Sequence, residues 1–290
     1  MQSKSVLFLG FGDIARRTAN LLQDYRCVAV ARSLRTVPPS AEFWCGAADS
    51  PAICERMQNR AFDAVVITLT PAEHTPDAYE RAYVATLHNL LLVWRAQPPG
   101  LVLFVSSTSV YHQSDGGWVD EESDVLPEHF SGRCLLRAER LLQDSDLPVC
   151  IVRFAGIYGP GRDFLLRQVR AGKGGSPEFT NRIHADDCAG FLAHLLRRHF
   201  AGGTLEPLYI GCDSGPAPGA EVRRWLAERI GVDPAGLVSS ISERGGNKRC
   251  SNRRLLASGY QMLYPSYREG YGALLSSGEV GWSSCGSSQS

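Results

Sequence analysis

The chain has 290 residues, with 30 lysine and arginine residues against 30 aspartate and glutamate residues, and so carries no formal net charge at pH 7. This balance excludes a global electrostatic attraction to nucleic acid or to anionic membranes. No apolar run approaches the roughly 20 residues that a membrane-spanning helix needs. The apolar amino terminus is short and leads into Gly10-Phe11-Gly12, which favours a first β-strand over a signal peptide. We therefore expect a cytoplasmic protein with neither nucleic-acid nor membrane partners.

Nine cysteines are scattered from Cys27 to Cys285, and none forms a C-x-x-C pair or has zinc-ligand spacing. Most lie in apolar stretches, such as Cys150 in LPVCIVRF, where a thiol packs as a small hydrophobic group. The sequence predicts reduced thiols and no metal site.

Short apolar runs alternate with amphipathic segments along the first part of the chain. The runs are rich in Val, Ile and Leu, as parallel strands covered on both faces require; they are SVLFLG, CVAVARS, FDAVVITLT, GLVLFVSS, PVCIVRF and EPLYIGC, with a further strand expected before GAADS. The segments between them include residues 14–22 and 77–96, whose apolar residues share one helical face. Pro98, Pro99 and Gly100 are expected to end the second of these helices. This alternation predicts an α/β fold, a Rossmann-type doubly wound parallel sheet.

The pattern becomes less regular after Gly159, where helical segments are separated by joints rich in glycine and proline. We expect residues 1–160 to form the Rossmann domain, with residues 181–212 returning to it. Residues 161–180 and 213–275 would form a smaller C-terminal substrate lobe. The serine- and glycine-rich residues 276–290 have no periodicity and are expected to be a disordered tail.

A glycine-rich turn follows the first predicted strand and opens the first predicted helix. In this G-x-G-x-x-A motif, Gly10 permits the tight turn, Gly12 allows a pyrophosphate to approach the backbone, and Ala15 keeps helix and strand close. The amino terminus of the helix supplies N–H groups and the positive end of the helix dipole. The alternative is a tight turn without a ligand. We favour dinucleotide binding, with contacts from Gly10, Phe11, Gly12, Asp13, Ile14 and Ala15.

The end of the second predicted strand bears on the choice between NAD and NADP. An NAD site places an acidic residue there for the ribose hydroxyl, whereas this chain has Ala31-Arg32-Ser33, with Arg35 close behind. The Arg32 guanidinium and the Ser33 hydroxyl can bind a 2′-phosphate, although Arg32 could instead be a solvated strand end. We expect NADP to be preferred over NAD. Asp49 could contact the adenine or cap the helix that starts near Pro51.

Several further motifs follow one another along the chain: FLGFGDIA, FVSSTSVYH, VRFAGIYGPGR and NRIHADDCAG. With these motifs the chain resembles the extended short-chain dehydrogenase/reductase superfamily, in its atypical NAD(P)-dependent nucleotide-sugar epimerase/dehydratase branch. The resemblance covers most of residues 5–200, and the later segment NKRCSNRRLLASGYQMLYPSYREGYGALL is similar to the substrate lobe of small members. It implies a nicotinamide cofactor and a polar small-molecule ligand such as a nucleotide sugar. It also makes a homodimer one expectation, formed through the helices that end near Trp94 and Leu142.

The resemblance assigns roles to residues around the segment SSTSVY. It places the substrate-orienting hydroxyl at Ser107 and a substrate contact at Thr108. The family's general acid/base is a tyrosine with a lysine four residues later, and alignment on Ser107 and on Ala138-Glu139 puts these two positions at Ser131 and Leu135. A serine hydroxyl does not ionise near neutral pH, and a leucine carries no charge. Losing a positioned acid/base lowers a rate by about 10²–10⁴-fold.

Other side chains could move the proton in place of the missing pair. Tyr111, Tyr158, His112 and His129 are the candidates, although we favour packing or surface roles for all four.

Downstream, the resemblance places Ala155, Gly156 and Ile157 beside the nicotinamide. It makes Arg162 a clamp for a substrate phosphate or carboxylate, with a solvent-facing arginine as the alternative. One of Asp186 and Asp187 is expected to cap the helix that follows.

Two functions from different classes remain open. In the first, the chain binds NADP without ordinary family catalysis, as a cofactor sensor or a binding module. In the second, it is an active NADP-dependent reductase, epimerase or dehydratase that acts on a nucleotide sugar or a similar polar alcohol with a substitute acid/base. The vacant Tyr and Lys positions favour the first function, and the segments SSTSVY and IYGPGR favour the second.

Overall fold

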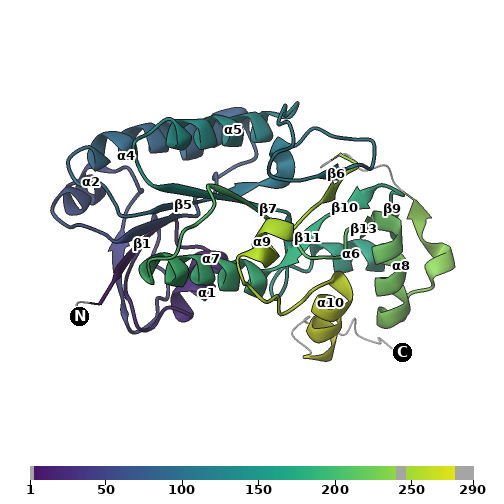
Figure 1. The fold of residues 1–290 in the computed structure, drawn as a ribbon. Coiled ribbons are helices and arrows are strands. Elements are labelled where there is room, and N and C mark those ends of the chain that lie inside the picture. The colour runs from purple at the N-terminus through teal and green to yellow at the C-terminus, as the bar shows by residue number, and fades with distance from the viewer. Residues whose placement is uncertain (1–2, 240–245, 278–290) are drawn as a thin grey trace.

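The computed structural model describes residues 3–239 and 246–277. A seven-stranded sheet forms the middle of the molecule, and helices cover both of its faces (Figure 1). Every strand pair in this sheet is parallel. In spatial order the strands are β12 (Leu208–Gly211), β7 (Val149–Phe154), β5 (Val102–Ser107), β4 (Ala64–Ile67), β1 (Ser5–Leu9), β2 (Arg26–Ala31) and β3 (Ala41–Cys45).

The sheet is doubly wound, as the alternation of strands and helices predicts. One face is covered by α1 (Asp13–Asn20) and α7 (Ala185–Phe200), and the other by α2 (Pro51–Gln58), α4 (Thr86–Trp94) and α5 (Phe130–Gln143) (Figure 1). The central strands are buried along their whole length, which is why their sequences are continuously apolar. The strand order reverses between β1 and β4, and a crevice at the carboxyl ends of the strands is expected at such a point. The predicted fold class is therefore confirmed.

The helical segment before Pro98 is less regular than its sequence pattern suggests. A single helix over residues 77–96 was the expectation, but the structure contains α3 (Pro76–Tyr79), a π-helical segment η1 (Glu80–Ala85) and then α4. The Thr86 hydroxyl donates to the carbonyl of Arg81, five residues earlier, inside this wider turn. A π segment shifts the phase of the helix, and such segments often occur near functional sites.

The remaining elements form a smaller region on the right of Figure 1. Its own apolar core contains Leu166, Trp225 and Tyr271. Its helices are α6 (Phe164–Arg170), α8 (Gly219–Ile230) and α10 (Tyr267–Ser276), with the 3-10 turn η3 (Pro234–Gly236) after α8. The short helix α9 (Arg253–Ala257) packs instead against β12 of the large sheet, and the 3-10 turn η2 (Thr108–Val110) follows β5. The short strand pairs are β6 (Trp118–Val119) with β15 (Arg249–Cys250), β8 (Gly156–Tyr158) with β11 (Arg182–His184), β9 (Lys173–Gly175) with β14 (Val238–Ser239), and β10 (Phe179–Thr180) with β13 (Ala217–Pro218).

Three expectations concern chain ends, membranes and thiols. Ser276 is the last residue of α10 rather than the start of the tail, and residues 278–290 of the expected tail lie outside the described residues. Across the ranges that the structure describes, no helix is both long and apolar enough to span a bilayer. The eight cysteines within those ranges are free thiols, and Cys285 falls beyond them.

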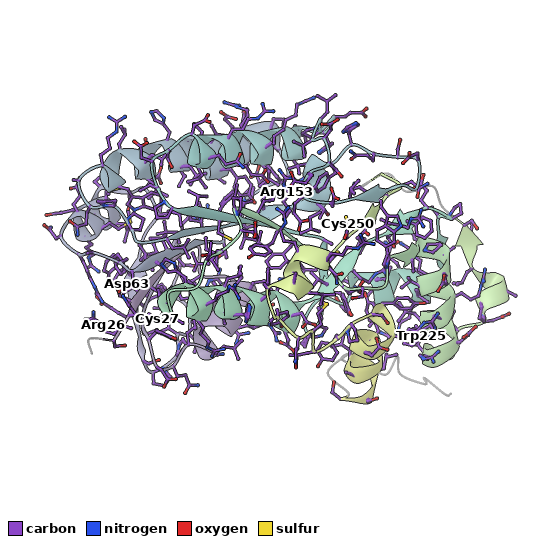
Figure 2. The ribbon with its side chains drawn as sticks, viewed as in Figure 1. Arg26, Cys27, Asp63, Arg153, Trp225 and Cys250 are labelled. Atoms are coloured by element: carbon purple, nitrogen blue, oxygen red, sulfur yellow. The ribbon has the colours of Figure 1, made fainter. Side chains whose placement is uncertain are left out.

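A buried ion pair joins α5 to the sheet. Glu139 on α5 accepts hydrogen bonds from the guanidinium of Arg153 on β7, the shortest at 2.6 Å, and from the hydroxyl of Ser106 on β5 at 2.5 Å. Both members of the pair are almost completely buried, at 4% exposed for the Arg153 side chain and 0% for Glu139. Figure 2 shows Arg153 in the layer between the sheet and α5. This contact fixes which face of α5 looks toward the sheet.

Replacing Glu139 with leucine should destabilise the protein by about 3–5 kcal/mol, because Arg153 would remain buried without its counter-charge. Urea unfolding measures the effect. Arg137→Ala provides the control on the same helix, since its 2.7 Å ion pair with Glu80 is exposed and is expected to be worth about 1 kcal/mol or less. Equal losses in the two variants would contradict the assigned role of the buried pair.

Candidate functional site

The turn between β1 and α1 lies at the reversal point of the sheet. Gly10 has φ of +86°, and a Cβ placed on it would lie 2.8 Å from the carbonyl oxygen of Thr68, at the end of β4. The Gly10 N–H donates to the carbonyl of Val30 on β2. Only glycine combines this backbone conformation with such a close approach. The first glycine of the motif is therefore required by the fold itself.

Gly12, unlike Gly10, has open space beside its backbone. A Cβ placed on it would meet no atom within 4 Å, so the space beside its backbone is open. Gly12 is the N-cap residue of α1, and no side chain caps the helix. The first turn of α1 therefore presents its N–H groups to an open crevice, which is the arrangement that binds phosphate groups.

A cavity of about 430 Å³ extends from this turn along the carboxyl ends of β1 to β4. Gly10, Phe11 and Gly12 line one end of it, and Arg32, Ser33 and Arg35 line it after β2. The cavity has a mixed lining of backbone, small apolar side chains and cations. Its other residues include Val30, Ala31, Ala47, Ala48, Asp49, Leu69, Thr70, Ala72, Ala78, Ala82 and Thr86.

The remaining members of the glycine motif lie beside the cavity rather than in its lining. Ile14 and Ala15 are buried in the core between α1 and the sheet. Phe11, which borders the cavity, also packs its ring edge-on against Phe8. Asp13 starts the first turn of α1, where its carboxylate accepts a 2.9 Å hydrogen bond from Arg17. These side chains shape the turn, while the backbone of the glycines faces the open space.

Asp49 lies on the cavity, and its carboxylate accepts a 3.0 Å hydrogen bond from Asn89. It is not the cap of α2, because Ser50 occupies the N-cap position. Of the two roles open for Asp49 in the sequence, only the one at the cavity is compatible with this geometry.

The sequence analysis missed Thr68 and Arg81. Thr68 follows β4 and donates its hydroxyl to the carbonyl of Gly10, and the residues after a buried strand in TLTP were a usable signal for it. Arg81 reaches the cavity from the π segment, whose altered phase the sequence pattern does not reveal.

No protein-family model matches this chain. It is 35% identical to a Methylobacillus flagellatus protein assigned as an NAD-dependent epimerase/dehydratase, with a TM-score of 0.80 and coverage of 96% of this chain and 99% of that one. The chain belongs to the NAD(P)-dependent epimerase/dehydratase family.

Two further relatives are more distant. The human epimerase family protein SDR39U1 is 27% identical over 190 residues, 58% of this chain and 63% of the human protein. A structure of its isoform 2 with NADPH has a TM-score of 0.72 at 18% identity, covering 94% of this chain and 99% of that one. MoeE5 in complex with UDP-glucuronic acid and NAD has a TM-score of 0.75 at 20% identity, with coverage of 94% and 98%. At sequence identities of 18% and 20%, the similarity to these two structures shows the fold alone.

Ser131 and Leu135, the positions where the resemblance expects the family's Tyr and Lys, lie on the face of α5 that carries Glu139. Ser131, Leu135 and Glu139 are spaced by four residues and therefore share one helical face, and Glu139 is the residue bonded to the sheet. The first turn of α5 also touches the region after β5, since a Cβ on Gly132 would lie 2.5 Å from the carbonyl oxygen of Ser109. Ser131 is thus placed toward the carboxyl end of β5, where Ser107 lies.

The Lys position is filled by apolar packing. Leu135 is buried at 5% exposure and belongs to the core cluster that also contains Tyr83, Val110 and Ala138. A side chain in this environment makes no polar contact with a cofactor ribose.

The Tyr position has a polar neighbour. Ser131 is half-buried, and its Oγ lies 2.7 Å from Nδ1 of His129, which also accepts the Ser131 backbone N–H. His129 is stacked on His74, with ring centroids 5.5 Å apart and an angle of 11°. His74 in turn contacts the Tyr79 hydroxyl at 3.2 Å. His129, His74 and Tyr79 therefore form a chain of contacts that begins at Ser131, and no sequence pattern linked His74 to it.

Tyr111 is a poor substitute for the missing acid/base. Its hydroxyl donates to the carbonyl of Asp120 at 2.8 Å and accepts from Arg153 at 2.9 Å. Burial raises the pKa of Tyr111 well above its ordinary value, and the nearby Arg153 guanidinium only partly opposes that rise. This geometry favours a structural role. Tyr158 is also buried with a raised pKa caused by burial, and it stacks on Tyr271 in the smaller region.

Ser107 and Thr108, the two expected substrate contacts, already have partners inside the protein. Ser107 ends β5, and its Oγ accepts the N–H of Ser109 at 3.1 Å. Thr108 is 9% exposed and hydrogen-bonds the Cys250 thiol, so its hydroxyl is used inside the protein. Lys248, which the sequence analysis did not single out, lies close by with its Nζ donating to the carbonyl of Tyr111 at 3.2 Å. Burial lowers the pKa of Lys248.

The segment after β7 lines a second hollow of about 450 Å³. Gly156, Ile157 and Arg162 are on its surface, whereas Ala155 is buried beside it. The Arg162 guanidinium lies 3.5 Å from the Asp13 carboxylate, so it reaches the start of α1 rather than open solvent.

The start of α7 corrects one expectation. Its N-cap residue is His184, whose Nδ1 accepts the N–H of Asp186, and neither aspartate caps the helix. Asp187 is buried and accepts hydrogen bonds from the N–H groups of Leu263 and Tyr264. Within residues 3–239 and 246–277 no group of three or more side chains is arranged to hold a metal ion.

Proposed function

We propose that this chain is an NADP-binding member of the family that does not carry out ordinary family catalysis and acts as a cofactor sensor or a binding module. The observation that carries the proposal is the open crevice beside Gly12, continuous with the cavity that runs to Arg32 and Ser33. The pyrophosphate would bind at the start of α1, and the adenosine would lie along the carboxyl ends of β2 and β3. When bound, the nicotinamide would supply hydride chemistry.

The preference for NADP rests on the charges at the far end of the cavity. Arg32, Arg35 and Arg81 line it, together with the Ser33 hydroxyl. Asp49 is the acidic residue on the lining, and it already accepts a hydrogen bond from Asn89. Guanidinium groups bind a 2′-phosphate strongly. The structure of human SDR39U1 with NADPH and that of MoeE5 with NAD support a nicotinamide dinucleotide at this place.

The absence of ordinary catalysis rests on α5. The Lys position holds Leu135 in the apolar core, so no ammonium group is available there to lower the pKa of a neighbouring acid or to hold the ribose. The Tyr position holds Ser131, whose side chain is shorter than a tyrosine. Binding of the cofactor and turnover of a substrate would therefore be separate properties of this protein.

A small polar molecule such as a nucleotide sugar is the ligand class that we propose beside the cofactor, because MoeE5 was solved with UDP-glucuronic acid. Ser107 would orient it. Residues 161–180 and 213–275 would form the lobe that recognises it, and residues 1–160 with 181–212 would form the cofactor domain.

Gly12→Ala tests cofactor binding. The added methyl group meets no protein atom. The free energy of unfolding of the variant should therefore lie within about 0.5 kcal/mol of the wild-type value. The methyl group would fill the space of the pyrophosphate, and the Kd for NADPH should rise about 10-fold or more by isothermal titration calorimetry. Gly272→Ala on α10, where a Cβ is equally free of contacts, should leave the Kd unchanged. Wild-type protein that binds neither NADPH nor NADH would overturn the proposed function.

Arg32→Ala tests the preference for NADP. The Kd for NADPH should rise by about 10- to 100-fold, as expected for a charge-assisted contact with the 2′-phosphate. The Kd for NADH should change little, because NADH lacks that phosphate. Arg26→Ala, at the other end of the same strand, is the control. Equal effects of Arg32→Ala on both nucleotides would remove the argument for NADP.

The contact between Ser131 and His129 favours a second candidate function, an active NADPH-dependent reductase. In this case a hydride would pass from the reduced nicotinamide to a carbonyl carbon. The Ser131 hydroxyl would give its proton to the carbonyl oxygen and take one from the His129 imidazole, whose Nδ1 lies 2.7 Å from the Ser131 Oγ.

NADPH oxidation with a panel of nucleotide-linked keto sugars distinguishes the two functions. A reductase of this kind should lose about 10²–10⁴-fold in kcat when His129 is replaced by alanine or Ser131 by alanine. His88→Ala, at an exposed histidine on α4, should leave kcat unchanged. Turnover that is independent of His129 and Ser131 would exclude this relay, and the absence of any turnover would leave the binding function.

A further inference from the structure

The contact between Arg162 and Asp13 joins two segments that lie far apart in the sequence. Arg162 follows the turn Gly159-Pro160-Gly161, and Asp13 is the first residue of α1. Their side chains approach to 3.5 Å between Nη2 and Oδ2. Neither this Asp13 oxygen nor the buried Arg162 Nε has a hydrogen-bond partner among the described residues. The two opposite charges are thus close in space, but their hydrogen-bonding groups are incompletely paired.

Asp13 keeps two cationic partners when Arg162 is left out of account. Its Oδ1 accepts a 2.9 Å hydrogen bond from Nε of Arg17 and a 3.2 Å hydrogen bond from Arg16, both on the same helix. Arg17 is held further by a 2.6 Å contact with Asp186. Arg162 is the most distant of the three guanidinium groups, and it alone comes from outside α1. It can therefore leave Asp13 without leaving a carboxylate unpaired.

The place of this contact is the start of α1, one residue beyond the open space beside Gly12. A pyrophosphate in that space would bring two negative charges next to Asp13. The repulsion would be strong at short range in a partly buried site. A cation that moves from Asp13 to the phosphates would offset part of the phosphate charge and form charge-assisted hydrogen bonds with it.

The segment that carries Arg162 permits such a movement. Gly159 has φ of +143° and Gly161 has φ of +76°, and a Cβ on Gly161 would meet no atom within 4 Å. The Arg162 N–H closes the turn by donating to the carbonyl of Gly159 at 3.0 Å. The Arg162 side chain remains 37% exposed.

We propose that Arg162 binds the pyrophosphate of the dinucleotide, and that its ion pair with Asp13 is the resting contact which the phosphates replace. This inference rests on the proposed function and reassigns Arg162 from the substrate, where the family resemblance places it, to the cofactor. It also gives Asp13 a role, as a carboxylate that holds the guanidinium at the crevice and competes with the phosphates for it.

Calorimetric titration with three probes tests the proposal: NADPH, NADH and adenosine 2′-monophosphate, which has no pyrophosphate. Arg162→Ala should raise the Kd of NADPH and of NADH by the same factor, about 10- to 100-fold, because the pyrophosphate is common to both. It should leave the Kd of adenosine 2′-monophosphate unchanged. Asp13→Asn removes the competing charge and should lower the Kd of both dinucleotides by about 3- to 10-fold.

The control is Arg167→Ala, whose guanidinium is 65% exposed and paired with Asp163 within the same segment; it should change none of the three affinities. Arg162→Ala protein that binds both dinucleotides as the wild type does would overturn the proposal and return Arg162 to the substrate. A loss of affinity that includes adenosine 2′-monophosphate would overturn it as well, because the effect would then be a general disturbance of the site. Wild-type protein that binds no probe would instead refute the proposed function, and with it this role of Arg162.

Discussion

The buried ion pair between Glu139 and Arg153 fixes the orientation of α5 against the sheet. Charges removed from water this completely are tolerated only with close, well-directed partners, and Glu139 has them in Arg153 and in the Ser106 hydroxyl. The contact locks the rotation of α5 about its axis. Because side chains four residues apart share a helical face, it also decides that Leu135 and Ser131 look toward the sheet. The side chains at these two positions therefore belong to the candidate site and not to an exposed surface.

The same helix separates two properties that usually occur together in this family. The proposed cofactor site depends on the backbone around Gly10 and Gly12, at the end of β1. In the sheet, β4 separates β1 from β5, the strand under α5, so this backbone does not depend on a particular residue of α5. Leu135, where the resemblance expects the lysine, packs in the apolar core beside Tyr83 and Ala138. The open space beside Gly12 lies at the start of a different helix, α1, and is shaped independently of that residue.

The cleft nevertheless carries unusual charge and proton-transfer groups. A carboxylate at the amino end of α1 is favourable for an empty helix terminus but unfavourable next to a pyrophosphate, and three arginines compensate it. Near the start of α5, Ser131 contacts His129, which stacks on His74, and His74 in turn contacts Tyr79. Both groups join side chains that are distant along the chain, near the carboxyl ends of the strands.

The sequence by itself determined the features that depend on local spacing. The parallel α/β fold followed from continuous apolar runs, and the turn at Gly10 followed from a motif of six residues. That Ser131 and Leu135 share one face of α5 followed from their interval of four residues. Each of these is set by helical or strand periodicity, which adjacent residues encode.

The tertiary structure decided which side chains from distant parts of the chain contact one another. It placed Arg162 against Asp13, Thr108 against Cys250 and Arg81 on the cavity through a π-helical turn. It also showed that Asp49 faces the cavity and that His184 caps α7. Contacts of this kind join residues that are distant along the chain, and a single sequence carries no periodic signal for them, because they arise only when the packed sheet brings its loops together.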